Sequence, residues 1–318
     1  MEQTETKPET KPETKPEQKI KKIRHLVLSG GGDIGISFFG ALRASNEAGF
    51  WNIEDIQSIY ATSAGSLFGT VIALNNHVSW ETLDVFFKKR PWEQVFDVNV
   101  DSVLKSFANC GILGCETAYK FLSPVLLASD LGKDVTMREF FEHTGIDMHY
   151  MTTNLDKFEL VDVSHKTHPD WKVVEAVYAS CALPVMFQPI TIDGTKYADG
   201  AIFCNFPIKQ CLANVDDPDE IFAMQKVEKS FDTTDPHNEE PKKPNNDLLT
   251  YLGDILLKLL YSVSRENEHG NLIKHILRFP SNKTNLFDIY RCAAETEYRI
   301  GLRDEGIRLW EEFFQTRR

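Results

Sequence analysis

The sequence predicts an α/β protein built on a mainly parallel sheet. An apolar run at Arg24–Ser29 has the pattern of a strand and ends abruptly in a glycine-rich segment. A helix with an apolar face is expected over 36–48, with Gly49 as its C-terminal stop. A second apolar run, Ile59–Ala61, leads into a second helix over Leu67–Leu74. Strands that alternate with helices in this way form parallel sheets with right-handed crossovers.

The turn after the second strand places Ser63 among small residues, which are Ala61, Thr62, Ala64 and Gly65. A nucleophile elbow needs small neighbours because the chain turns sharply from strand to helix. The serine hydroxyl would then lie at a helix N-terminus, where free N–H groups favour a developing negative charge. A serine that merely caps the helix would have the same surroundings, so this turn alone leaves both interpretations open.

The glycine-rich segment after the first strand, GGGDIG at 30–35, predicts a loop whose backbone approaches another group closely. Its spacing also satisfies the G-x-G-x-x-G fingerprint of dinucleotide-binding folds. That interpretation requires an acidic residue at the end of the second strand. Here the strand ends in ATSAG, and Asp55 precedes it. Nucleotide binding is therefore disfavoured.

The middle of the chain continues the alternation of strands and helices. Thr136, followed by Glu139, has the pattern of a capped helix start. An Asp-Gly turn at 193–194 predicts a hairpin that ends just before Asp199. This aspartate would be either a plain turn residue or a base with open space beside it. The other expected elements are helices over 80–89 and 173–180 and strands over 148–153 and 158–163.

Composition narrows the function classes. The chain has 318 residues, 42% of them hydrophobic, and a formal net charge of −12. This acidic balance argues against nucleic acid as a partner and against simple electrostatic adhesion to anionic lipid. The N-terminus has no apolar signal core, and no run approaches the ~18 apolar residues of a membrane span. We therefore expect a cytoplasmic protein that is soluble or in peripheral contact with membranes.

Neither the cysteines nor the histidines are spaced like metal ligands, and no metal is expected. The 6 cysteines are scattered, which predicts free thiols in a reducing compartment. Cys110 and Cys115 lack a matching second pair, so buried thiols are expected there. The histidines of the central region are expected to be structural or surface residues: His77, His143, His149, His165 and His168.

Segments at both ends differ from this core. Residues 3–17 repeat Thr, Glu, Lys and Pro without an apolar residue, so 1–22 are expected to form a disordered tail. A polar stretch over 228–246 predicts an exposed loop. Apolar residues at helical spacing over 248–263 predict a helix, either packed on the sheet or acting as a lipid-contacting lid. A final helix over 295–314 is expected to cover the core.

Four blocks of residues together resemble the patatin-like phospholipase family. In the family's order and approximate spacing they are GGGDIG at 30–35, TSAG at 62–65, ASCALP at 179–184, and YADGA at 197–201 with NFP at 205–207. The resemblance covers roughly 24–210 and implies a three-layer α/β/α fold. We accordingly expect a catalytic domain over 23–210, with 211–318 as a C-terminal extension of the same domain.

The resemblance also implies a chemistry. Ser63 matches the nucleophile, and Asp199 of the Asp199-Gly200-Ala201 motif matches the base of a Ser–Asp dyad that needs no histidine, metal or organic cofactor. A base is required because a serine hydroxyl alone is a poor nucleophile. The implied reaction is hydrolysis of a phospholipid or other lipid ester, phospholipase A-like or lysophospholipase-like, through an acyl-serine. The other matched residues are those of the oxyanion hole, Gly30, Gly31, Gly32, Gly35 and Ala64, and of the elbow, Ala61 and Gly65.

Departures from the family pattern keep alternatives open. Ala61 replaces the first glycine of G-x-S-x-G, and Ile34 stands beside Asp33 where the family usually carries a basic residue. These features would suit a catalytically weak lipid-binding or regulatory protein. An α/β-hydrolase triad in the order Ser, Asp, His is a further alternative, disfavoured because that fold places several strands before its elbow. Its candidate histidines are His237, His269 and His275.

Overall fold

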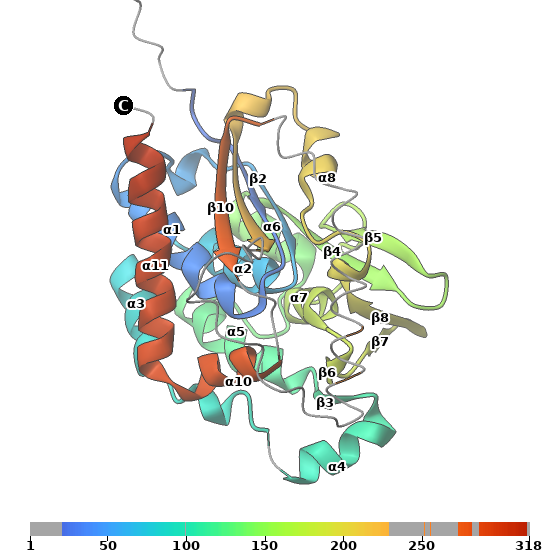
Figure 1. The fold of residues 1–318 in the computed structure, drawn as a ribbon. Helices are drawn as coiled ribbons and strands as arrows, with labels where there is room; N and C mark the ends of the chain where they lie inside the picture. Colours follow the sequence, from blue (N-terminus) through green and yellow to red (C-terminus); the bar gives the residue numbers. More distant parts are fainter. Residues whose placement is uncertain are drawn as a thin grey trace, which may run out of the picture.

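A computed structural model of the protein describes residues 21–98, 100–228, 273–281 and 286–316, together with positions 251 and 255 (Figure 1). Several sequence-based expectations fall on other residues. Nearly all of the expected tail, the polar stretch after residue 228 and most of the expected helix at 248–263 lie outside the described residues. The same is true of His237 and His269.

The centre of the fold is a mixed sheet with the strand order β10-β9-β1-β2-β4-β8-β7, in which β5 also pairs with β4 (Figure 1). From β10 to β4 every neighbouring pair is parallel, whereas β5, β7 and β8 pair antiparallel. The prediction of an α/β fold with a mainly parallel sheet is confirmed. The strands are β1 (His25–Leu28), β2 (Ser58–Thr62), β4 (Asp147–Asn154), β5 (Glu159–Val163), β7 (Ile190–Ile192), β8 (Thr195–Asp199), β9 (Ile221–Glu228) and β10 (His275–Ser281).

Both faces of the sheet are covered, and a strand covered on both faces is buried along its length, as all four residues of β1 are. Side chains alternate between the faces: Leu26 and Leu28 belong to a large core cluster with the main helical layer, and Val27 belongs to a smaller cluster under α8. The helices are α1 (Gly35–Glu47), α2 (Ala64–Ala73), α3 (Trp80–Lys89), α4 (Val100–Asn109), α5 (Glu116–Ala128), α6 (Met137–Thr144), α7 (Val173–Cys181), α8 (Ile208–Leu212), α10 (Leu286–Ala294) and α11 (Thr296–Gln315). A separate parallel pair is formed by β3 (Gly111–Leu113) and β6 (Val185–Phe187).

Local sequence signals correctly predicted several elements. Thr136 and Glu139 form a reciprocal capping box at the start of α6. Asp193 and Gly194 both have positive φ, 49° and 80°, as a tight hairpin turn between β7 and β8 requires. The strands expected over 148–153 and 158–163 are β4 and β5, and the expected helices over 80–89 and 173–180 are α3 and α7.

The C-terminal part contributes more to the sheet than the sequence suggested. Besides covering helices it supplies β9 and β10, which were not predicted, and β9 lies directly beside β1. Helix α11 packs tightly along α1 (Figure 1). A Cβ on Gly40 would lie 2.2 Å from the carbonyl oxygen of Arg303, and one on Gly306 would lie 2.0 Å from that of Ser37. The helix axes can approach this closely only because glycines occupy both positions.

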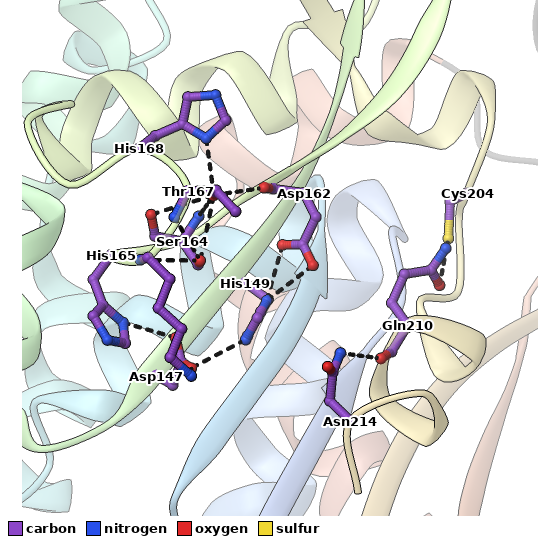
Figure 2. Close-up of polar contacts among 11 residues, drawn as sticks. Asp147, His149, Asp162, Ser164, His165, Thr167, His168, Cys204, Gln210 and Asn214 are labelled. Carbon is purple, nitrogen blue, oxygen red and sulfur yellow. Dashed lines mark hydrogen bonds and ion pairs between the residues drawn. The ribbon is translucent and has the colours of Figure 1, made fainter.

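A buried ion-paired cluster, whose side chains are drawn in Figure 2, occupies the start of β4. Asp147 in this cluster pairs with Ser58, at the end of β2 that lies farther from Ser63. His149 lies between two carboxylates, with Nδ1 2.9 Å from Asp162 and Nε2 3.4 Å from Asp147. Asp147 also contacts His165 at 2.8 Å and Lys166 at 2.7 Å. Burial by itself lowers the pKa of His149, but the two carboxylates outweigh it and raise this pKa to about 9. His149 is therefore a structural cation, in agreement with the expectation from sequence.

The cysteines are all free thiols, as predicted. Cys110 is exposed and Cys115 is half-buried, so the prediction of buried thiols at these two positions is wrong. In the part of the chain that the structure describes, no helix has both the length and the apolar character needed to cross a bilayer. Over the same residues, no group of three or more His, Cys, Asp or Glu side chains is arranged to hold a metal ion.

Candidate active site

Ser63 occupies the sharp turn between β2 and α2. Its φ of 53° and ψ of −127° lie in a region that non-glycine residues rarely adopt. The turn brings α2 against the end of β1, so that a Cβ on Gly65 would lie 2.5 Å from the carbonyl oxygen of Leu28. The small residues of this segment are therefore a steric requirement. The Ser63 side chain makes no hydrogen bond to the start of the helix, which argues against the interpretation of a simple cap.

The Ser63 hydroxyl instead donates to Asp199, with Oγ 2.7 Å from Oδ2. Asp199 is the last residue of β8, which pairs with β4, and β4 in turn lies beside β2. Asp199 is only 1% exposed, and its Oδ1 accepts the N–H of Ala201 at 2.8 Å. One carboxylate oxygen is thus held by the backbone, and the other faces the serine directly.

Burial raises the pKa of Asp199 from its usual 3.8 to about 7, and the hydrogen bonds from Ala201 and Ser63 oppose this rise only in part. A general base works best when its pKa lies near the working pH. Because Oδ2 lies within hydrogen-bonding distance of the serine, this carboxylate is placed to accept the serine proton.

Supporting hydrogen bonds hold both residues in place. The Ser63 N–H donates to Oγ of Ser180 at 3.0 Å, and this hydroxyl donates to the carbonyl oxygen of Met151 at 2.6 Å. The Thr153 hydroxyl donates to the carbonyl oxygen of Asp199 at 2.8 Å. Ser180 and Thr153 were not identified as site residues from the sequence. Ser180 lies in the ASCALP block at 179–184 but was given no role there, and Thr153 lies in none of the four blocks. A buried hydroxyl needs a hydrogen-bond partner, which is the physical signal that both residues share.

Two of the glycines predicted to supply the oxyanion hole, Gly30 and Gly35, donate their N–H groups to carbonyl oxygens of the protein in this structure. The Gly30 N–H donates to the carbonyl oxygen of Asn205 at 2.8 Å, and the Gly35 N–H bonds within its own helical turn. Both positions instead require close packing. A Cβ on Gly30 would lie 2.3 Å from Oδ1 of Asn205, and one on Gly35 would lie 2.4 Å from the ring of Phe68.

The remaining predicted donors are Gly31, Gly32 and Ala64. Among the described residues, no protein group accepts their N–H groups. Ala64 is the first residue of α2, where a helix leaves its N–H unpaired, and Gly32 has a φ of 60° that suits glycine. All three line one cavity together with Ser63. The site therefore combines a hydroxyl, a base and unpaired N–H donors.

The departures from the family pattern fit into the fold. A Cβ on Gly69 would lie 3.7 Å from the Cβ of Ala61, so the extra methyl of Ala61 faces a helix position without a side chain. Ile34 is buried in the core. The Asp33 carboxylate accepts the hydroxyl proton of Tyr298 at 2.7 Å, and burial together with this carboxylate raises the pKa of that tyrosine.

The cavity beside Ser63 encloses about 160 Å³ and is mainly apolar. Arg299 reaches it from α11, but Nε donates to the carbonyl oxygen of Phe87 at 3.1 Å and Nη1 to that of Ala293 at 2.8 Å. The guanidinium therefore joins the C-terminal ends of α3 and α10. Aromatic side chains line much of the wall: Phe68, Phe87, Trp92, Phe96, Phe121 and Phe187.

Lys226 also lines the cavity, and the sequence analysis missed it because β9 was not recognised as a strand. Its side chain is 7% exposed, and Nζ lies 3.5 Å from the carbonyl oxygen of Gly31. Its backbone N–H donates to Oγ of Ser29 at 2.9 Å. The signal that could have found it is a lysine that follows an apolar run over 221–224.

His275, the one triad candidate within the described residues, lies far along the sheet from Ser63. It is the first residue of β10 and pairs with Phe222 near the start of β9, where its ring contacts Phe50 at 5.3 Å. Ser63 follows the last residue of β2, and strands β10 to β2 all run the same way. The two residues therefore lie at opposite ends of the sheet.

Comparisons with known proteins found a matching family model, relatives in sequence and similar solved structures. A family model described as "Patatin-like phospholipase" matches residues 26–212. The probable lipid hydrolase 463L of Invertebrate iridescent virus 6 is 25% identical over 192 residues, which cover 60% of this chain and 63% of that protein. Triacylglycerol lipase ptl3 of Schizosaccharomyces pombe is 28% identical over 170 residues, 52% of this chain and 34% of that protein. The chain thus spans less than two thirds of these relatives. The crystal structure of VipD from Legionella pneumophila matches with a TM-score of 0.42 at 16% identity, over 89% of this chain and 67% of that one.

Proposed function

Because the chain belongs to the patatin-like phospholipase family, we propose that it is a serine acyl hydrolase that cleaves carboxylic esters of lipids. Ser63 is the nucleophile and Asp199 the base. The observation that carries this proposal is the direct hydrogen bond of 2.7 Å between Oγ and Oδ2 at a turn of positive φ. Nothing separates the two groups, so a dyad accounts for the site without a histidine.

The first half-reaction transfers the acyl group to the enzyme. Ser63 Oγ attacks the ester carbonyl carbon as its proton passes to Oδ2 of Asp199. The oxyanion that forms accepts hydrogen bonds from the N–H groups of Gly31, Gly32 and Ala64. When the C–O bond to the alcohol breaks, Asp199 returns the proton to the leaving oxygen, and an acyl-serine ester remains.

The second half-reaction is the hydrolysis of this ester. A water molecule attacks the acyl carbon and gives a proton to Asp199, and the same N–H groups receive the oxyanion again. Collapse releases the carboxylic acid, and Ser63 recovers its proton from Asp199. Each half-reaction uses the carboxylate first as a base and then as an acid, which suits a group with a pKa of about 7.

The apolar cavity supports a lipid substrate. Its aromatic side chains offer an acyl chain an apolar surface, and burial of apolar area favours binding by about 25 cal/mol per Å². The names of the relatives, a probable lipid hydrolase and a triacylglycerol lipase, point to the same substrate class.

A substrate panel tests the proposal. Purified protein is incubated with a phosphatidylcholine, a lysophosphatidylcholine and a triacylglycerol, and released fatty acid is measured by mass spectrometry. We expect hydrolysis of at least one lipid, loss of that activity in Ser63→Ala, and its retention in the matched control Ser58→Ala at the other end of β2. Lipid binding without fatty-acid release would favour a lipid-binding protein instead.

A further inference from the structure

A buried lysine adjoins the glycine loop. Strand β9 pairs with β1 so that Met224 lies opposite Leu28, the last residue of β1. Lys226 lies two residues further along β9 and its side chain is 7% exposed. Lysine is rarely buried to this degree, because removing an ammonium group from water is costly unless other groups compensate. Lys226 is held by polar partners, and the carbonyl oxygen of Gly31 in the loop is one of them.

The side chain of Lys226 lies along Gly31. A Cβ on Gly31 would be 3.7 Å from Cδ of Lys226, and Nζ donates to the carbonyl oxygen of Gly31 at 3.5 Å. The carbonyl and N–H of a trans peptide point in opposite directions. A lysine that holds the Gly31 carbonyl oxygen on one side therefore turns the Gly32 N–H to the other side.

The peptide between Gly31 and Gly32 has two such restraints, because its carbonyl oxygen also accepts the N–H of Ile34 at 3.3 Å. Glycine residues have no Cβ to limit their backbone angles, so a peptide between two of them can rotate at little cost. Gly32 has a φ of 60°, and its N–H is accepted by no protein group among the described residues. If this peptide rotated by half a turn, the carbonyl oxygen would take the place of the N–H donor.

We propose that Lys226 is a positioning residue, which orients the Gly31–Gly32 peptide so that the Gly32 N–H faces the oxyanion formed at Ser63. This inference rests on the proposed function, since it assigns a task within the same reaction. Lys226 acts through the loop and not by binding the lipid. Its loss should therefore slow the chemical step and leave substrate binding largely unchanged.

The experiment compares wild type, Lys226→Met and Lys226→Arg with the matched control Gln225→Met, the neighbouring buried residue of β9. Steady-state kinetics use a short neutral p-nitrophenyl ester, so that attraction of an anionic head group cannot contribute. For Lys226→Met we expect kcat to fall by about 10- to 100-fold, short of the 10²–10³-fold loss of a complete donor, with KM within about twofold. Lys226→Arg should recover most of kcat, and Gln225→Met should resemble wild type.

Hydrogen–deuterium exchange over residues 29–35 gives a readout independent of catalysis. We expect faster exchange in Lys226→Met, near wild-type exchange in Lys226→Arg and Gln225→Met, and unchanged exchange in core strands as evidence of folding. Unchanged loop exchange, or a raised KM with unchanged kcat, overturns the positioning role. If the wild-type enzyme shows no Ser63-dependent hydrolysis but loop exchange responds to Lys226→Met, the proposed function fails while the restraint of the loop by Lys226 is upheld.

Discussion

Replacement of Asp199 with asparagine should abolish turnover and at the same time stabilise the protein. The asparagine oxygen can still accept the N–H of Ala201, which the native Oδ1 accepts at 2.8 Å. The amide nitrogen would then face Ser63 and cannot take up its proton. Proton transfer in both half-reactions requires this group, so we expect hydrolysis to fall to background in a variant that remains folded.

The size of the stabilisation follows from the pKa of Asp199, which burial raises from 3.8 to about 7. Between these pH values the native state holds a proton that the unfolded state has lost, so wild-type stability falls as pH rises through this window and then levels off. Each pH unit in this window lowers the free energy of unfolding of the wild type by about 1.4 kcal/mol, so at pH 8 it is about 4 kcal/mol lower than at a pH where Asp199 is protonated in both states. Asparagine does not ionise, so Asp199→Asn should be more stable by about 4 kcal/mol at pH 8 and by about 2 kcal/mol at pH 5.

Urea unfolding of wild type and Asp199→Asn at pH 5 and pH 8 measures this difference, and Ser63→Ala serves as an inactive control that keeps the carboxylate. Wild-type activity should rise with pH and level off above about 7, as the base becomes ionised. Near-normal hydrolysis by Asp199→Asn would refute the assignment of the base. An equal gain in stability at both pH values would refute the raised pKa.

Two further substitutions test the support of the site and the charge cluster of the fold. Ser180→Ala leaves the Ser63 N–H without its acceptor at 3.0 Å. We therefore expect the free energy of unfolding, measured with urea, to fall by about 2 kcal/mol, and we expect kcat to fall as well. Unchanged stability and an unchanged kcat would rule out a role of Ser180 in holding Ser63. His149→Gln removes a cation with a pKa raised to about 9. The protonated His149 should stabilise the folded protein by about 3 kcal/mol, and this contribution should be fully present below pH 6.5 and lost as pH rises through 9. Unfolding curves of wild type and variant should therefore converge by about pH 10, and a difference independent of pH would contradict the raised pKa.

The proposed reacting groups, Ser63 and Asp199, could be identified from the sequence because each lies in a short contiguous motif. Ser63 and Asp199 are flanked by small residues for steric reasons that act within a few positions of the chain, as the contact between Gly65 and Leu28 illustrates. The alternation of apolar runs and helical patterns likewise predicted the order of β1, α1, β2 and α2.

The availability of each backbone donor could not be predicted, because it depends on distant partners. Glycines 30 and 32 are alike in the sequence, but only Gly30 is engaged by Asn205, 175 positions away. Lys226 reaches the site through the pairing of β9 with β1 and lies in no motif. Ser180 lies in the ASCALP block at 179–184, but its contact with the Ser63 N–H depends on how α7 packs. Strand β9 was missed because a short apolar run does not distinguish a buried strand from a loop or helix segment.

The most direct test of Ser63 as the nucleophile is covalent labelling with a fluorophosphonate serine probe, followed by peptide mass spectrometry to locate the adduct. We expect one adduct on Ser63 in the wild-type protein, labelling that becomes faster as pH rises toward 8, and no adduct in Ser63→Ala. Labelling that persists in Ser63→Ala, or an adduct found only on another serine, would contradict the assignment of Ser63.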